Sequence, residues 1–163
     1  MTLPNPDHYL DQAEHLITLS NARQADLRRA VSTAYYAVFH AVMRAAADTY
    51  IGSTNRNTAE YALAYRQIDH AGLKSVCEYC MNPSFAVGAQ PFKFGPDLRA
   101  FAAAVLELRG LRHRADYDPA LYLYVLDVRT VIATARDALN RFRSLAYDQR
   151  RVRRTCSITR IWI

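Results

Sequence analysis

The spacing of apolar and polar residues along the chain predicts helices and no sheet. Apolar positions recur three and four residues apart through long stretches rich in Ala, Leu and Arg, which is the period of a helix that buries one face. The clearest such stripe contains Leu27, Val31, Ala34, Val38 and Val42. The alternation typical of strands is absent, and the chain holds only five glycines. We therefore expect an all-α protein.

Helix-breaking residues divide this pattern into separate helices. Pro119 disfavours helical geometry at Asp118, and the segment 81–96, with three prolines and two glycines, is the longest predicted loop. Short links between long helices imply an antiparallel up-and-down bundle of about five helices. The predicted helices span residues 7–20, 24–50, 58–80, 96–117 and 120–146. We assign residues 1–146 to one helical domain and 147–163 to a basic C-terminal tail.

The net positive charge of the chain comes from its C-terminal end. The formal net charge is +6, and residues 141–163 account for all of it, with seven arginines against one aspartate. Such a density of arginine attracts phosphate backbones through counterion release, although a solvated tail is the alternative. The apolar last residues, ITRIWI, suggest docking on the body of the protein or on a partner.

Composition also bears on the compartment and on metals. No apolar run reaches the length of a membrane span, and the polar N-terminal segment lacks a signal-peptide core, so we expect a cytoplasmic protein with no membrane contact. Cys77, Cys80 and Cys156 are too few and uneven for a disulfide framework. The Cys77–Cys80 pair needs two more ligands for structural zinc, and nothing brings Cys156 close. We expect no metal and no cofactor, and buried or idle thiols.

A dense polar cluster, LRHRADYDP, closes the predicted fourth helix. Arg109, Arg112, His113 and Asp116 share one helix face, and Tyr117 follows one residue round. A guanidinium binds phosphate bidentately, and a neighbouring imidazole or phenol can move a proton, so the set suits the handling of a phosphodiester. The alternative is Arg–Asp pairing that ties down the helix end.

The predicted second helix carries a matching polar face. Arg29, Thr33, Tyr36 and His40 recur at helical spacing opposite much of the apolar stripe, and the alternative is an ordinary solvated face. Because Tyr35 and Tyr36 are adjacent, they cannot both point into the core. One of them must face a partner helix, a second subunit or a cleft.

These two segments resemble a known family. DLRRAVSTAYYAVFHAVMRAAA, residues 26–47, resembles the signature helix of the HEPN superfamily, small all-α domains of prokaryotic toxin–antitoxin, defence and RNA-processing systems. LRHRADYDP resembles the family's second signature, at the end of a later helix. The resemblance implies a homodimer whose paired motifs line a shared cleft. In active members it implies metal-independent cleavage of RNA, in which an arginine holds the phosphate and a histidine four to six residues later transfers the proton.

This chain departs from that catalytic pattern. If Arg112 takes the place of the family arginine, His113 lies beside it and Tyr117 stands where the histidine belongs. A phenol has an ordinary pKa of about 10 and is a poor base at neutral pH. Either His113 has taken over the proton transfer, or the protein binds RNA without cleaving it, which we favour. Arg112, His113 and Tyr117 are thus the candidate catalytic residues, and the candidate substrate-binding residues are Arg109, Asp116, Arg29, Tyr36 and His40.

Three functions follow as hypotheses. The first is a dimeric HEPN-like domain that binds RNA phosphates in a toxin–antitoxin, defence or RNA-handling system, for which the resemblance allows a nucleotidyltransferase-type antitoxin as partner. The second is a metal-independent ribonuclease that uses His113. The third is a structural adaptor that binds a protein partner through residues 147–163.

Overall fold

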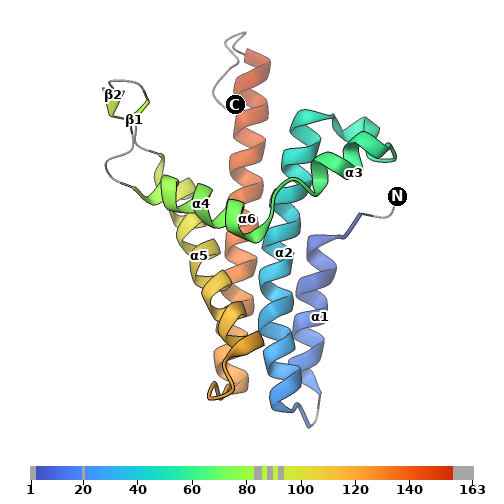
Figure 1. The fold of residues 1–163 in the computed structure, drawn as a ribbon, viewed down its shortest axis with the longest axis vertical. Coiled ribbons are helices and arrows are strands. Elements are labelled where there is room, and N and C mark those ends of the chain that lie inside the picture. Colours follow the sequence, from blue (N-terminus) through green and yellow to red (C-terminus); the bar gives the residue numbers. More distant parts are fainter. Residues whose placement is uncertain (1–2, 20, 83–85, 88–89, 92–93, 156–163) are drawn as a thin grey trace.

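The computed structural model describes residues 3–19, 21–82, 86–87, 90–91 and 94–155. These residues form a helical bundle (Figure 1), which confirms the predicted all-α architecture. The α-helices of the described chain are α1 (Pro6–Thr18), α2 (Gln24–Tyr50), α3 (Ala59–Tyr65), α4 (His70–Met81), α5 (Pro96–Tyr117) and α6 (Val125–Thr155). A 3₁₀ turn, η1 (Ser53–Asn55), and a short antiparallel hairpin of β1 (Ala86–Val87) and β2 (Gln90–Pro91) lie between them.

Four long helices lie side by side along the longest axis of the molecule. Figure 1 shows that α1 and α2 run in opposite directions, as do α5 and α6. Helix α2 is the centre of the arrangement, because it packs against α1, α3, α5 and α6. Helix α4 packs across α5, and α3 lies against the C-terminal half of α2.

The core forms where the apolar stripes of these helices meet. The predicted stripe of α2 is buried at Leu27, Val31, Ala34 and Val38, whereas Val42 is partly buried against the core. The other helices contribute fully or almost fully buried residues, among them Leu10, Ala13, Phe101, Val105, Leu108, Val128, Ile132, Ala135 and Leu139. Burial of one of the larger of these side chains, a Val, Leu, Ile or Phe, stabilises the fold by about 1.5–3 kcal/mol, so this shared core holds the bundle together.

Local capping sets several helix starts. The Asn5 side chain accepts a hydrogen bond from the Asp7 backbone N–H at 3.1 Å, and Pro6 occupies the first turn of α1, where a missing N–H costs nothing. Thr58 caps α3 through the backbone N–H of Tyr61 at 3.2 Å. These contacts are local, and so the starts of the first two long helices and of α5 fall close to their predicted positions.

The predicted helix over residues 58–80 is wrong, because α3 and α4 replace it. The Asp69 side chain accepts a hydrogen bond from the Gly72 backbone N–H at 2.6 Å, which starts a new helix at His70. Helix α3 packs on α2, whereas α4 packs on α5. One straight helix cannot reach both surfaces, and the chain therefore turns at residues 66–69.

The predicted last helix also differs at both ends. Helix α6 starts at Val125 rather than at residue 120, because α2 holds the preceding segment in a non-helical form. It continues to Thr155, and the predicted domain end at 146 therefore falls inside it. The predicted loop 81–96 contains the β1–β2 hairpin.

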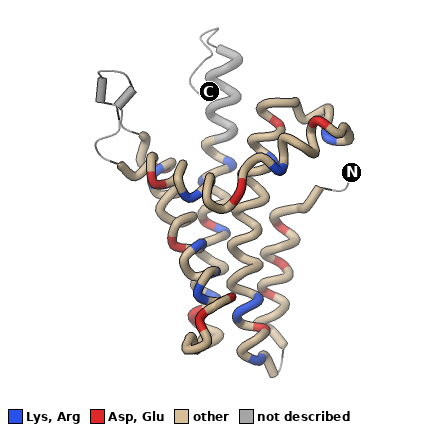
Figure 2. The backbone as a smooth tube through the Cα atoms, in the orientation of Figure 1, with Lys and Arg blue, Asp and Glu red and all other residues tan. Residues whose placement is uncertain are grey.

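Both signs of charge are interleaved on the bundle. Figure 2 shows basic and acidic positions mixed over the part of the bundle that it colours, although α1 carries acidic positions and no Lys or Arg. This agrees with the equal numbers of basic and acidic residues in positions 1–140. In the described part of the chain, no helix combines the length and the apolarity that a membrane span requires.

Candidate functional site

Side chains of the first turns of α2 form hydrogen bonds with the segment that follows α5. The Arg28 guanidinium donates hydrogen bonds to the backbone carbonyls of Ala115, at 3.0 Å, and Asp118, at 2.8 Å, and a further one to the carbonyl of Leu121. Gln24 exchanges two hydrogen bonds with the backbone of Leu123, at 2.8 and 3.0 Å. The last backbone carbonyls of a helix have no hydrogen-bond donor within their own helix. Here a side chain of α2 provides the missing donors.

Arg112 is the most tightly constrained charge of the predicted cluster. Its Nε lies 2.7 Å from Asp116 Oδ2, an ion pair without hydrogen-bond alignment of the Nε–H, and its Nη2 donates to the Tyr36 hydroxyl at 3.0 Å. The guanidinium carbon lies 5.6 Å from the centroid of the Tyr36 ring and 5.9 Å from that of the Tyr117 ring. Two aromatic rings, a phenol oxygen and a carboxylate thus fix the orientation of this side chain.

Asp116 is itself held by α2. The Ser32 hydroxyl, which is buried, donates to Asp116 Oδ1 at 2.5 Å. Ser32, Asp116, Arg112 and Tyr36 therefore form one hydrogen-bonded and ion-paired chain between α2 and α5, which we call the Ser32–Tyr36 chain. The alternative that Asp116 pairs with Arg112 is confirmed. The side chain of Arg112 nevertheless remains 19% exposed, and its Nη1 has no hydrogen-bond partner among the described residues.

His70, at the first position of α4, lies beside these arginines. Its Nδ1 is hydrogen-bonded to the Tyr35 hydroxyl at 2.9 Å, and its ring centroid lies 4.2 Å from that of Phe39. Arg109 Nε donates to the His70 backbone carbonyl at 3.3 Å. Burial lowers the pKa of His70, and the charges of Arg112 and Arg109 lower it further, so this imidazole is neutral at pH 7.

His40 forms a second imidazole site on the same side of α2. Its Nδ1 is hydrogen-bonded to the Tyr65 hydroxyl at 2.8 Å, and its ring stacks on that of Tyr9 with centroids 4.9 Å apart. Burial lowers the pKa of His40, with a smaller effect from His70. The Tyr36 ring lies 6.1 Å from the ring of His40 and 5.8 Å from that of His70, so Tyr36 is close to both imidazoles as well as to Arg112.

The structure brings most, but not all, of the predicted site residues together. Arg112, Asp116, Tyr117 and Tyr36 are in direct contact with one another or with a shared partner, and Arg109 reaches the same region through His70. His113 is exposed and lies against Tyr117, with ring centroids 5.0 Å apart.

On α2, the predicted polar face divides into solvated and covered positions. Arg29 is exposed, as a solvated face requires, but Thr33 is only 2% exposed. The reason is that α2 is surrounded by neighbouring helices, which cover positions opposite its apolar stripe. Tyr35 is fully buried and Tyr36 is half-buried, as their adjacency predicted.

Arg28, Ser32 and His70 belong to the site but are not among the candidate site residues predicted from the sequence. Ser32 lies one helical turn before Tyr36, a spacing that places both on one side of α2 and that could have identified it. Arg28 and His70 carry no such local signal, because their partners lie in distant segments.

The two described cysteines are buried thiols. Burial raises the pKa of Cys77 to about 12 and also raises the pKa of Cys80, which keeps both protonated at neutral pH. Among the described residues, no three His, Cys, Asp or Glu side chains converge as metal ligands would. Cys156 and the ITRIWI segment lie outside the described residues.

Comparison with protein-family models, with curated proteins and with solved structures finds no match for the chain. What the site does is therefore inferred from its geometry and from the two sequence signatures.

Proposed function

We propose that the protein is a HEPN-like homodimeric domain of a toxin–antitoxin, defence or RNA-handling system, and that it binds RNA phosphates at the end of α5 without cleaving them. The observation that carries the proposal is the fixed orientation of Arg112, with Arg109 one helical turn before it on the same side of α5. A guanidinium that is already oriented loses less entropy when it binds a phosphate.

The pairing of Arg112 leaves part of its guanidinium for a ligand. Asp116 takes the Nε edge and Tyr36 takes one N–H of Nη2. The two N–H groups of Nη1 have no partner among the described residues, and so they can donate to a phosphate oxygen. Because Asp116 neutralises much of the charge, we expect modest affinity from this site alone, with the C-terminal arginines adding to it.

The position of His113 supports binding without cleavage. Proton transfer requires the base within about 3.2 Å of the reacting group or one water away. The ring contact found for His113 in the described structure is with Tyr117, outside the Ser32–Tyr36 chain. Tyr117 stands where the family histidine belongs, and its ring packs on Arg112.

Exposed apolar residues support the homodimer. The side chains of Tyr117, Tyr122, Tyr124 and Leu126 are 64–72% exposed, and the Tyr122 and Tyr124 rings lie 5.2 Å apart. Exposed apolar side chains are typical of an interaction surface, and the ring of Tyr117 lies beside the guanidinium of Arg112. Light scattering at micromolar concentration should give a dimer, which a Tyr122→Asp, Tyr124→Asp double variant should dissociate. A monomeric native protein would contradict the shared cleft.

The binding test compares Arg112→Gln with Arg129→Gln, an exposed arginine of α6. Fluorescence anisotropy with a labelled single-stranded RNA should show binding that Arg112→Gln weakens about tenfold, as expected when a charge-assisted hydrogen bond is removed. Arg129→Gln should change it little. Equal effects of the two substitutions would rule out a specific role for Arg112.

The second candidate function is a metal-independent ribonuclease. It is favoured by His70, a neutral imidazole next to Arg109. Incubation of the pure protein with RNA in the presence of a chelator tests it. Cleavage that disappears in His113→Ala would support the His113 mechanism, cleavage that disappears in His70→Ala would support proton transfer by His70, and intact RNA after prolonged incubation would support binding alone.

A further inference from the structure

A polar pocket lies near the C-terminal end of α2 and does not include Arg112 or its partners. It has a volume of about 410 Å³ and connects the end of α2 with η1 and the start of the chain. Its lining residues are Leu3, Arg44, Ser53, Thr54, Arg56 and Asn57. Five of the six carry hydrogen-bond donors in their side chains, and two are arginines, whereas no acidic residue lines the pocket.

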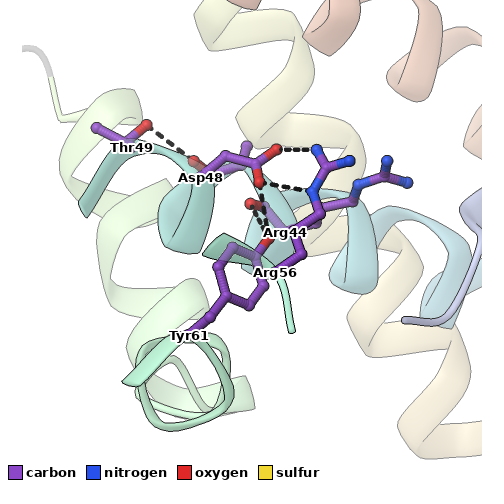
Figure 3. Close-up of polar contacts among 6 residues, drawn as sticks. Arg44, Asp48, Thr49, Arg56 and Tyr61 are labelled. Atoms are coloured by element: carbon purple, nitrogen blue, oxygen red, sulfur yellow. Dashed lines mark hydrogen bonds and ion pairs between the residues drawn. The ribbon is translucent and has the colours of Figure 1, made fainter. Parts of the chain in front are cut away.

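The acidic residue that contacts this group, Asp48, is already occupied. Arg56 donates to it through Nε at 2.9 Å and through Nη2 at 2.5 Å, and the Tyr61 hydroxyl donates to it at 2.8 Å (Figure 3). Burial by itself would raise the pKa of Asp48, but the hydrogen bonds from Arg56 and Tyr61 outweigh it and the pKa lies below its usual value. Asp48 is therefore ionised at neutral pH and balances one of the two arginines.

Arg44 supplies the charge that remains. Figure 3 shows its guanidinium beside that of Arg56, on the side away from Asp48. Among the described residues, the Arg44 side chain has no hydrogen bond or ion pair. Two guanidinium groups and one carboxylate leave one net positive charge at the pocket.

We propose that this pocket binds a phosphate group, held by Arg44 and Arg56 with the hydroxyls of Ser53 and Thr54. Paired guanidinium groups and hydroxyl donors match the oxygens of a phosphate, which accept hydrogen bonds and carry negative charge. A second pocket of about 330 Å³ shares the lining residue Leu3 with this one and is lined also by Pro4, Asn5, His8, Tyr9 and Gln12. It offers room for an organic group attached to the phosphate. The phosphate belongs either to a small phosphorylated molecule or to an RNA backbone.

Titration of the full-length protein with three probes separates these sources. The probes are inorganic phosphate, a nucleoside 5′-monophosphate and a single-stranded RNA without a terminal phosphate, each followed by calorimetry. Arg44→Gln should weaken binding about tenfold, because it removes a charged donor and no internal hydrogen bond. Arg66→Gln, an exposed arginine beyond α3 that does not line the pocket, is the matched control.

A second variant guards against an indirect effect of Arg44→Gln. Thr54 is exposed, and Thr54→Glu should abolish binding by placing a negative charge at the pocket without disturbing the core. Binding of phosphate or of the monophosphate that both variants weaken supports a small-molecule ligand. Binding of RNA alone, weakened by both, supports a backbone phosphate. If Arg44→Gln and Arg66→Gln behave alike with every probe, the site is refuted. In a protein that carries Arg112→Gln, the Arg44→Gln substitution should weaken phosphate binding by the same factor as in the native protein. The test of this pocket therefore does not depend on the function proposed for Arg112.

Discussion

Arg28 and Arg29 are neighbours in α2 that have different environments. Arg28 donates hydrogen bonds to three backbone carbonyls at and beyond the end of α5, whereas Arg29 is exposed. The difference of one residue rotates the side chain by about 100° round the helix, from the α5 side to solvent. Two identical residue types therefore contribute unequally to stability, and the same holds for Tyr35 and Tyr36.

We expect Arg28→Leu to lower the free energy of unfolding by about 2–3 kcal/mol. It removes the charged donor and leaves partly buried carbonyls without a partner. The matched variant Arg29→Leu should stay within about 0.5 kcal/mol of the native protein. Urea unfolding followed by circular dichroism measures both. A similar decrease in the two variants would show that the Arg28 hydrogen bonds contribute little.

The buried imidazoles predict a pH dependence of stability. Burial lowers the pKa of both His40 and His70, so the folded protein binds fewer protons than the unfolded chain. Their contribution is complete above the ordinary histidine value of about 6.5 and is lost as the pH falls below it, until the lowered pKa is reached. The urea concentration at the unfolding midpoint should therefore decrease as the pH is lowered from about 7 to about 5.5.

The double variant His40→Gln, His70→Gln should flatten this part of the curve. His15→Gln, an exposed histidine of α1, serves as the control and should leave the slope as it is. If the double variant keeps the native slope, other groups cause the pH dependence.

The formation of α3 depends on one set of polar contacts, those of Tyr61 and Arg56 with Asp48. It is short, and it lies on α2 through Tyr61, whose hydroxyl reaches Asp48 alongside Arg56 (Figure 3). A helix of seven residues is not stable by itself, so this contact and the burial of Tyr61 and Tyr65 decide whether it forms. The exposed ion pairs that join other helices, Arg136–Glu14, Arg141–Asp97 and Arg143–Asp7, connect helices that already pack against each other.

Asp48→Asn should therefore loosen α3 before it affects the rest of the bundle. The substitution breaks a partly buried ion pair, and we expect a decrease in stability of about 1–2 kcal/mol after allowance for solvent screening. Hydrogen exchange should become faster in residues 59–65 and stay unchanged in the middle of α6. Glu78→Gln, which breaks the exposed Lys74–Glu78 pair, should have almost no effect. Uniformly faster exchange in all helices of Asp48→Asn would contradict this local role.

Across the protein, the charge is divided between a balanced bundle and a basic end. Positions 1–140 carry equal numbers of basic and acidic residues, interleaved as Figure 2 shows for the residues it colours. Five of the arginines lie in residues 147–163, against one aspartate. If RNA binds, its long-range attraction should come from this end, while Arg112 positions a phosphate on the bundle.

Removal of residues 147–163 should therefore reduce the dependence of RNA affinity on salt. For a single strand, the slope of log K against log[salt] becomes shallower by about 0.7 for each phosphate that the protein ceases to neutralise. Anisotropy titrations between about 50 and 200 mM salt measure it. Arg112→Gln should instead change the slope by the amount expected for about one phosphate. An unchanged slope after truncation would show that the tail takes no part in binding.

The helical class and most helix boundaries follow from the amino-acid pattern alone. The apolar period of α2, the prolines at the starts of α1 and α5 and the stop at Pro119 act within a few residues, so they can be recognised without knowledge of the fold. The same is true of the candidate residues of α5, because Arg112 and Asp116 lie one turn apart.

Tertiary packing determined the contacts between residues that lie far apart in the sequence, which the local signals do not contain. Ser32 meets Asp116 and Tyr36 meets Arg112 across separations of 84 and 76 positions, and Tyr35 meets His70 across 35. The break between α3 and α4 and the late start of α6 likewise depend on which neighbour each segment contacts. Such contacts form only when the apolar stripes have brought the helices together, since no short stretch of sequence contains both partners.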